Sequence, residues 1–202
     1  AKKRRFYVLV VGLILNFGLL AVIKYTAFAI SNVNRMTSLF GHGGFDIPDL
    51  ILPMGISFYI FQTMGYLIDV YRGRTEAEKD PFRLALFVGF FPQLVQGPIS
   101  RHSDLASQLY TPHSFELRGF TYGMQRILWG YFKKLVIADR VLTAMKALLE
   151  RPEAGEPELY SGAYVFLLII LYSVQIYADF TGGIDITVGI AQSLGITLKE
   201  NF

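Results

Sequence analysis

Three histidines, His42, His102 and His113, could act as a general base in this chain, because histidine exchanges a proton near neutral pH. His42 lies in a glycine-rich loop, His102 follows Arg101 at the end of an apolar run, and His113 stands beside Pro112 in a polar linker. None of the three falls within an apolar run. We therefore expect all of them to be solvated loop residues rather than members of a buried site.

Other patterns that carry chemistry are missing from the sequence. The chain has no Cys, which excludes disulfides and cysteine-ligated metal sites. It contains no nucleophile–base pair that can be identified by spacing, no HExxH-type metal-ligand pattern and no Walker-type glycine loop. The residues by themselves therefore predict no metal site.

Four charged residues lie in or beside apolar segments, where ionisable side chains are costly and often functional. Asp69 ends one apolar run and is expected to be an interfacial carboxylate. Arg126 could either extend to the membrane interface or bind an internal partner. Asp179 and Asp185 bracket Phe180–Ile184, which predicts a break between two helices. Asp185 could cap the second of these helices, or the two carboxylates could line a polar path.

The elements that must position these residues are apolar. Hydrophobic residues make up 52% of the 202 residues and charged residues only 17%, whereas soluble domains have about 25% charged residues. The composition therefore indicates lipid as the surrounding solvent. The net charge of +3 could suggest nucleic acid, but the basic residues stand at the ends of apolar runs. Membrane orientation explains them, and we expect no nucleic-acid partner.

The apolar residues are concentrated in runs long enough to cross a bilayer, which takes roughly 17–25 helical residues. Prolines and glycines interrupt several runs, and such breaks are tolerated at membrane depth only where protein or a water-lined cavity satisfies the backbone. We predict an all-α polytopic membrane domain over residues 1–202, a multi-helix bundle with kinked and re-entrant helices. Its expected spans are about 6–23, 50–68, 84–100, 119–138 and 159–178, with a half-span at about 186–198.

The basic residues also predict an orientation. The segment before the first span carries 4 lysines and arginines, and the segments that follow carry 2, 4, 2 and 5. Retention of positive charge in the cytoplasm produces this alternation. This pattern places the residue 1 side, residues 69–83 and residues 133–158 in the cytoplasm. Broken helices with polar groups also build transporters and channels, so a transporter or channel subunit is an alternative. No internal repeat between the two halves supports it, and a scaffold for partner proteins is a third hypothesis.

A resemblance narrows these alternatives. Leu52–Gln62, continued by Tyr66–Gly73, resembles a signature of the membrane-bound O-acyltransferase (MBOAT) family, in particular its alginate O-acetylation branch. Two positions depart from the family pattern: Gly183-Ile184 stands where Tyr-Ser is usual, and Gln96 stands where a small residue is usual. Further stretches fit the branch in the same order, namely residues 24–25, 90–94, 97–99, 123–134, 177–180 and 200–202.

The resemblance implies an MBOAT-like bundle in a bacterial inner (plasma) membrane. It implies an enzyme that moves an acyl group, most commonly acetyl, from a cytoplasmic thioester such as acetyl-CoA toward an extracellular polysaccharide such as alginate. No bound cofactor is implied. The expected partners are membrane lipid, the polysaccharide and an extracytoplasmic acetyl-transfer protein.

The resemblance also assigns residues. In the family, the region that bears the catalytic histidine follows a Glu-Asn-Phe segment, here residues 200–202, and none of the three histidines matches its motif. We therefore expect this chain to be an internal fragment that holds no catalytic residue and is inactive alone. Positions that match the family motifs and could line a tunnel or position substrate are Gln62, Arg101, Gln125 and Asp179.

Overall fold

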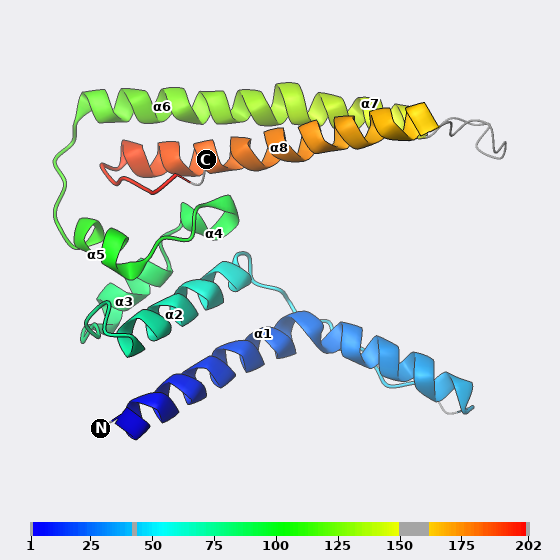
Figure 1. The fold of residues 1–202 in the computed structure, drawn as a ribbon, viewed down its shortest axis with the longest axis horizontal. Coiled ribbons are helices and arrows are strands. Elements are labelled where there is room, and N and C mark those ends of the chain that lie inside the picture. Colours follow the sequence, from blue (N-terminus) through cyan, green and yellow to red (C-terminus); the bar gives the residue numbers. More distant parts are fainter. Residues whose placement is uncertain (1, 42–43, 150–161, 201–202) are drawn as a thin grey trace. The chain divides into compact units, whose positions relative to one another are not determined.

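The computed structural model describes residues 2–41, 44–149 and 162–200. Within these ranges every regular element is a helix and no strand occurs, which confirms the predicted all-α class (Figure 1). His42 lies outside the described residues. The chain forms two compact units: unit 1 is Ala1–Val95 with Ile99–Tyr110, and unit 2 is Gln96–Pro98 with Thr111–Phe202.

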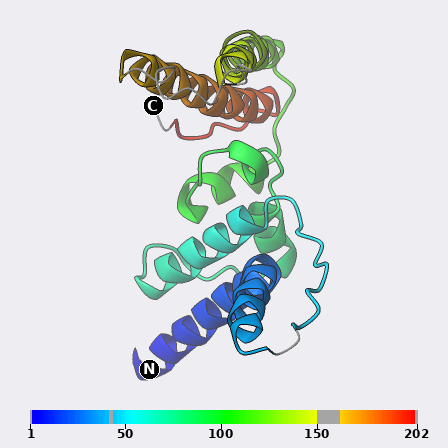
Figure 2. The same ribbon diagram turned by 90° about the vertical axis from the view of Figure 1, so that its right-hand side faces the viewer.

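Unit 1 is built on two antiparallel helices, α1 (Lys2–Leu39) and α2 (Ile56–Tyr71). Figures 1 and 2 show α2 alongside the first half of α1, so that the end of α2 returns to the beginning of α1. Gly12 allows this approach, because a Cβ added there would lie 2.9 Å from Leu67 Cδ1. At the shared end, the rings of Phe6 and Tyr71 lie 6.4 Å apart.

The helix α2 begins later than the predicted span at 50–68. Pro53 precedes it, and Gly55 adopts a left-handed conformation with φ of 77° directly before the first helical residue. A side chain at Gly55 would be strained, and its Cβ would lie 2.7 Å from the carbonyl oxygen of Leu94. The turn at Gly55 therefore sets the start of α2 and allows the chain around Leu94 to pack against it.

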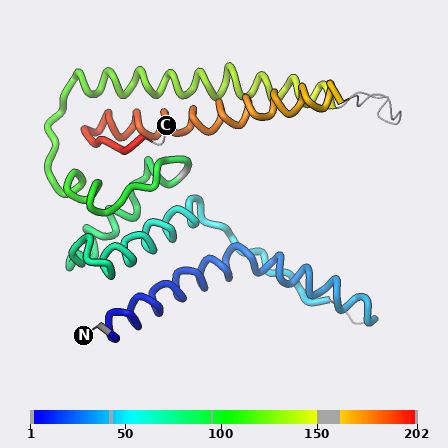
Figure 3. Tube along the Cα trace, viewed as in Figure 1, coloured from blue at the N-terminus to red at the C-terminus, as the bar shows by residue number. Residues whose placement is uncertain are grey.

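The predicted span at 84–100 is broken in the structure, as its prolines indicated. It contains the end of α3 (Pro81–Val88) and all of α4 (Gln93–Gln96), and α5 (His102–Leu109) follows it; Figure 3 follows the trace through these helices. Gly89 is the C-cap of α3, while Pro92 and Pro98 prevent a helix from continuing through them. At its start, α3 is capped by Asp80, whose carboxylate accepts a hydrogen bond of 2.8 Å from the N–H of Phe82.

Unit 2 is a long helical hairpin. Its first arm runs through α6 (Leu117–Tyr131), a π-helical segment η1 (Phe132–Ala138) and α7 (Asp139–Leu149), and its second arm is α8 (Gly162–Ser193). The two arms run antiparallel along each other (Figures 1 and 3). The predicted span at 119–138 therefore lies within a longer helical arm.

The predicted break at Phe180–Ile184 is wrong, because α8 continues through it without interruption. The predicted half-span at 186–198 is accordingly not a separate helix: its residues up to Ser193 belong to α8. The predicted span at 159–178 lies in the same helix, although residues 159–161 are outside the described residues. Gly182 and Gly183 are buried, so these glycines serve helix contact rather than a helix end.

Two glycine pairs bring the arms of the hairpin into backbone contact. A Cβ added at Gly189 would lie 2.7 Å from the carbonyl oxygen of Gly123, and one at Gly182 would lie 2.8 Å from that of Gly130. Each pair is seven residues from the other on its own helix, so both fall on the same face. Small residues at such positions allow apolar helices to approach closely.

Two helices of the described chain are long and apolar enough to cross a membrane, α1 and α8. Many of their large apolar side chains are exposed, with Phe28 at 68% and Phe166 at 64% of full exposure. Exposed apolar surface on this scale indicates contact with lipid or with further protein.

Alanine substitution tests the glycine contacts. We expect Gly182→Ala and Gly189→Ala each to destabilise the hairpin by about 1–3 kcal/mol, because the new methyl group overlaps the facing backbone. The matched control is Gly162→Ala, also on α8 and with no heavy atom within 4 Å of the added Cβ; alanine there should be neutral or stabilise by up to about 1 kcal/mol. Thermal unfolding of the purified protein in detergent measures all three. Equal melting temperatures would contradict the proposed contact.

Candidate functional site

Unit 1 contains a pocket of about 290 Å³ where the end of α2 faces the beginning of α5. We name it the His102 pocket. Two of the predicted site residues, Gln62 and Arg101, lie in its wall together. The complete lining is Phe61, Gln62, Gly65, Tyr66, Ile68, Asp69, Arg72, Arg74, Phe87, Ile99, Ser100, Arg101 and His102.

The prediction that His102 is a solvated loop residue is wrong. It is the first residue of α5 and is only 7% exposed. Its imidazole packs between aromatic rings, with ring centres 4.9 Å from both Tyr66 and Phe87. Pro98 ends the preceding apolar run, and the turn that follows brings the histidine back against α2 and α3. Its position after Arg101, at the end of an apolar run, suggested exposure, whereas the chain reversal produces burial.

Both ring nitrogens of His102 have partners within the protein. Nδ1 lies 3.3 Å from Thr75 Oγ1, and Nε2 lies 3.4 Å from the hydroxyl of Tyr110. The single hydroxyl hydrogen of Tyr110 is donated to the carbonyl of Arg83 at 3.0 Å. Tyr110 must then accept from His102 Nε2–H, which leaves Nδ1 to accept from Thr75. A histidine with both nitrogens engaged positions its neighbours and has no lone pair free for a substrate.

Burial lowers the pKa of His102 below its usual range, because the charged imidazolium loses hydration; the nearby carboxylate of Glu78 opposes this shift only in part. The neutral ring is therefore the stable form at pH 7. This agrees with the hydrogen bonds, since a neutral imidazole provides the one donor and one acceptor that Tyr110 and Thr75 require.

A buried amide pair adjoins the pocket, and one of its members, Gln62, belongs to the lining. Gln62 is buried on α2 and donates a 2.7 Å hydrogen bond from Nε2 to Oε1 of Gln93, which also accepts from the N–H of Ser100 at 3.3 Å. Oε1 of Gln62 and Nε2 of Gln93 have no hydrogen-bond partner among the described residues. Buried polar atoms without a partner are rare and costly. Oε1 of Gln62 is therefore a buried acceptor without a partner, on a residue that lines the pocket.

Charged side chains form the rim. Asp69 and Arg74 are joined by a 3.3 Å ion pair, and the Asp69 side chain is only 13% exposed. The side chain of Arg101, in contrast, is exposed beside the pocket, and among the described residues no ion pair joins it to a carboxylate. The pocket thus combines the neutral amide of Gln62 with a mainly cationic rim. Such a site can hold a hydroxyl-bearing or anionic group by hydrogen bonds.

The other predicted site residues belong to unit 2 and are not brought together there. Gln125 is exposed on α6. Asp179 on α8 accepts a 2.5 Å hydrogen bond from Lys134 Nζ on η1. Asp179 is therefore part of an ion pair between the two arms, and whether it also lines a tunnel stays a prediction.

The contacts of Arg126 and Asp185 bear on two alternatives that the sequence left open: whether Arg126 has an internal partner and whether Asp185 caps a helix. Arg126 Nε donates to Asp185 Oδ1 at 3.0 Å, and its Nη1 donates to Glu200 at 2.5 Å, so Arg126 has internal partners. Lys133 also pairs with Asp185. Asp185 lies inside α8 and caps no helix. These ion pairs neutralise charges that would otherwise be costly in an apolar surrounding.

The two departures from the family pattern lie against each other in unit 2. A Cβ added at Gly183 would come within 1.7 Å of Gln96 Oε1. The Gln96 side chain therefore occupies the space that a larger residue at position 183 would need. With glutamine at position 96 and glycine at position 183, the two residues together fill this contact.

The described residues hold no group of three or more His, Asp or Glu side chains that could bind a metal ion. His113 is exposed, and its imidazole carbon Cγ would lie 3.4 Å from a Cβ added at Gly195. Sequence reasoning missed His102 and its partner Thr75. The available signal was weak: a histidine one residue after an arginine, following a Gly-Pro turn between apolar segments.

Curated relatives match almost the entire chain. It is 34% identical over 196 residues to a protein of Pseudomonas putida named probable alginate O-acetylase AlgI, covering 96% of this chain and 39% of the relative. A peptidoglycan O-acetyltransferase of Helicobacter pylori is 34% identical over 222 residues, covering 96% of this chain and 40% of the relative. A teichoic acid D-alanyltransferase of Bacillus subtilis is 25% identical, covering 76% and 38%.

The chain thus spans about two fifths of the length of the curated relatives that it matches. No family model matches the chain.

The buried neutral His102 predicts how stability depends on pH. Because its pKa is lowered in the folded state, the unfolded chain binds a proton more readily, so stability falls as pH drops below the usual histidine value of about 6.5. Thermal unfolding between pH 8 and 5 should show this loss, and His102→Gln should reduce the dependence. His113→Gln, at an exposed position, serves as the control and should leave it unchanged. An identical pH profile for wild type and His102→Gln would contradict the assignment.

Proposed function

Because the chain belongs to the membrane-bound O-acyltransferase family, in its alginate O-acetylase-like branch, we propose that it forms part of the membrane body of a polysaccharide O-acyltransferase. The proposed enzyme moves an acyl group, acetyl in the first instance, from a cytoplasmic thioester such as acetyl-CoA to hydroxyl groups of an extracellular polysaccharide such as alginate. The observation that carries this proposal is the 34% identity extending over 96% of the chain.

The proposed setting is a bacterial inner membrane that the chain crosses several times. The two long apolar helices α1 and α8 support a membrane location. The exposed apolar side chains along them support contact with lipid or with further helices of the same bundle. The polysaccharide and an extracytoplasmic protein that receives the acyl group are the partners we propose.

The reaction sets requirements that the described residues meet only in part. Attack of an acceptor hydroxyl on the thioester carbonyl needs a base to accept the hydroxyl proton, and the thiolate of the donor leaves. His102 cannot serve as that base in the observed arrangement, since both of its nitrogens are hydrogen-bonded within unit 1. We therefore assign no catalytic residue to this chain and propose that its residues bind and orient substrate.

Within that role, the His102 pocket is the proposed positioning site of unit 1. Its free acceptor on Gln62 suits a hydroxyl donor, and the exposed guanidinium of Arg101 suits a carboxylate or phosphate. Gln125 and Asp179 remain proposed tunnel-lining residues of unit 2. Alginate is itself rich in carboxylates, so a cationic rim is consistent with the proposed acceptor.

Replacing Arg101 tests this function. We expect Arg101→Gln in the protein at its natural length to lower acyl transfer roughly tenfold to hundredfold, because a hydrogen bond to a charged group contributes about 1.5–3 kcal/mol. Arg101→Lys should restore part of the activity. The control, Arg140→Gln, removes an exposed arginine of α7 and should have no effect.

The measurement is the ester content of polysaccharide from a host that lacks its own acetylase, with alginate and peptidoglycan analysed separately. Alkaline release of acetate quantifies the product. Full ester content with Arg101→Gln would remove Arg101 from the site. Absence of any ester attributable to the wild-type protein, in either polymer, would refute the proposed function.

A further inference from the structure

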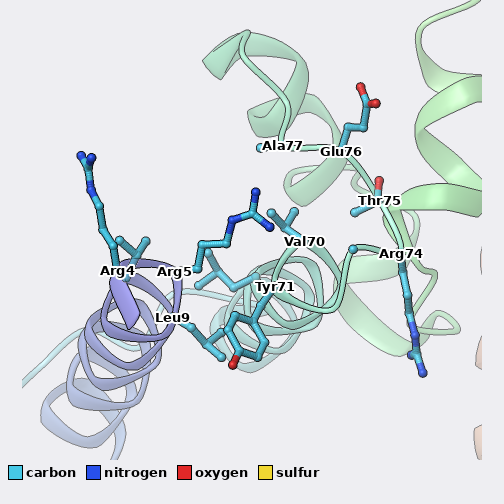
Figure 4. A pocket seen from close by; sticks show the side chains of 12 residues that line it. Arg4, Arg5, Leu9, Val70, Tyr71, Arg74, Thr75, Glu76 and Ala77 are labelled. Atoms are coloured by element: carbon cyan, nitrogen blue, oxygen red, sulfur yellow. The ribbon is translucent and has the colours of Figure 1, made fainter. Parts of the chain in front are cut away.

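A second and larger pocket of unit 1, of about 720 Å³, lies between the first turns of α1 and the segment that follows α2. We name it the arginine pocket. Its lining has two chemically distinct parts (Figure 4). Arg4, Arg5 and Arg74 supply positive charge, against one carboxylate, that of Glu76. The apolar part consists of Val8, Leu9, Leu67 and Val70.

The positive charge of this pocket is only partly neutralised. Arg74 is paired with Asp69 at 3.3 Å. Within the described residues, no ion pair joins Arg4 or Arg5 to a carboxylate, whereas five ion pairs are formed outside this pocket. In Figure 4 the side chain of Arg5 extends from α1 toward the α2 side of the pocket. Two guanidinium groups are therefore available for an anion.

The location of the arginines relates this charge to a membrane surface. Arg4 and Arg5 immediately precede the apolar run of α1, and Tyr71, whose ring lies 6.4 Å from Phe6, occupies the same end. Basic residues at the end of an apolar helix, with aromatic residues beside them, are typical of the level of lipid headgroups. Val8 and Leu9 continue from the arginines toward the hydrocarbon region, one helical turn further along α1.

We propose that the arginine pocket binds one anionic phospholipid, with its phosphate at Arg4 and Arg5 and an acyl chain along Val8, Leu9, Leu67 and Val70. A soluble phosphate would use only the cationic part and leave the apolar wall unmatched. A zwitterionic lipid would bring its own cation against the arginines. Basic pockets between helices on the cytoplasmic side are a recognised type of lipid-headgroup site. The inference rests on the proposed membrane placement of α1.

Photocrosslinking tests the proposal. The protein at its natural length is reconstituted into phosphatidylcholine vesicles that contain a photoactivatable analogue of either phosphatidylglycerol or phosphatidylcholine, and labelled peptides are mapped by mass spectrometry. We expect the phosphatidylglycerol analogue to label residues 4–9 and 67–77 selectively. At about 1 kcal/mol for each basic residue near an anionic lipid, Arg4→Gln with Arg5→Gln should weaken this labelling roughly 30-fold.

Two further double variants serve as controls for position and for charge. Lys24→Gln with Arg35→Gln removes the same charge from α1 outside the pocket and should leave labelling unchanged. Arg4→Lys with Arg5→Lys keeps the charge and should retain most of it. Equal labelling by the phosphatidylcholine analogue, full labelling of the double glutamine variant, or loss of labelling on adding soluble pyrophosphate would each overturn the lipid site.

Vesicle flotation distinguishes failure of the lipid site from failure of the proposed function, which includes the membrane placement. If the protein floats with the vesicles but is not labelled selectively, only the lipid site is rejected. If it floats with neither vesicle, the membrane placement of α1 is wrong and the lipid site fails with it.

Discussion

Apolar helices can be held together only where small residues allow their backbones to meet or where polar groups bond between them, since lipid is as apolar as the helices themselves. Unit 2 satisfies this constraint with glycines. Gly123 faces Gly189 and Gly130 faces Gly182, so the two arms of the hairpin approach to backbone contact at points one heptad apart. The register of the hairpin is fixed by these contacts, and the positions of its charged side chains follow from that register.

The charges of unit 2 are paired as a consequence. Asp185 binds Arg126 and Lys133, while Asp179 binds Lys134, so each carboxylate of α8 faces a cation of the opposite arm. The lysines lie in η1, where the π-helical turn changes the direction of side chains relative to an α-helix. Asp185 keeps one cationic partner if the other is lost, whereas Asp179 has Lys134 as its ion-pair partner among the described residues. These ion pairs therefore join the two arms of the hairpin in addition to the glycine contacts.

The segment 69–77 contributes lining residues to both pockets of unit 1. Arg74 lines both of them and is paired with Asp69. The His102 pocket is lined by the amide of Gln62, aromatic rings and a charged rim, while the arginine pocket combines cations with an aliphatic wall. The first suits a polar substrate and the second an amphiphile. This segment is held by the hydrogen bond between Thr75 and the buried His102 and by the bonds of Arg74 to Asp69.

The sequence by itself determined the helical class, the apolar segments and the family, because these follow from composition, run length and motif order. It also identified Gln62 and Arg101, which the structure brings into one pocket. Tertiary structure decided the continuity of α8 through Gly182 and the burial of His102. In both cases the deciding partner is distant in the chain: a glycine contributes to helix contact only when another helix lies against it, and a histidine is buried only when the chain reverses. Local patterns contain no information on such partners.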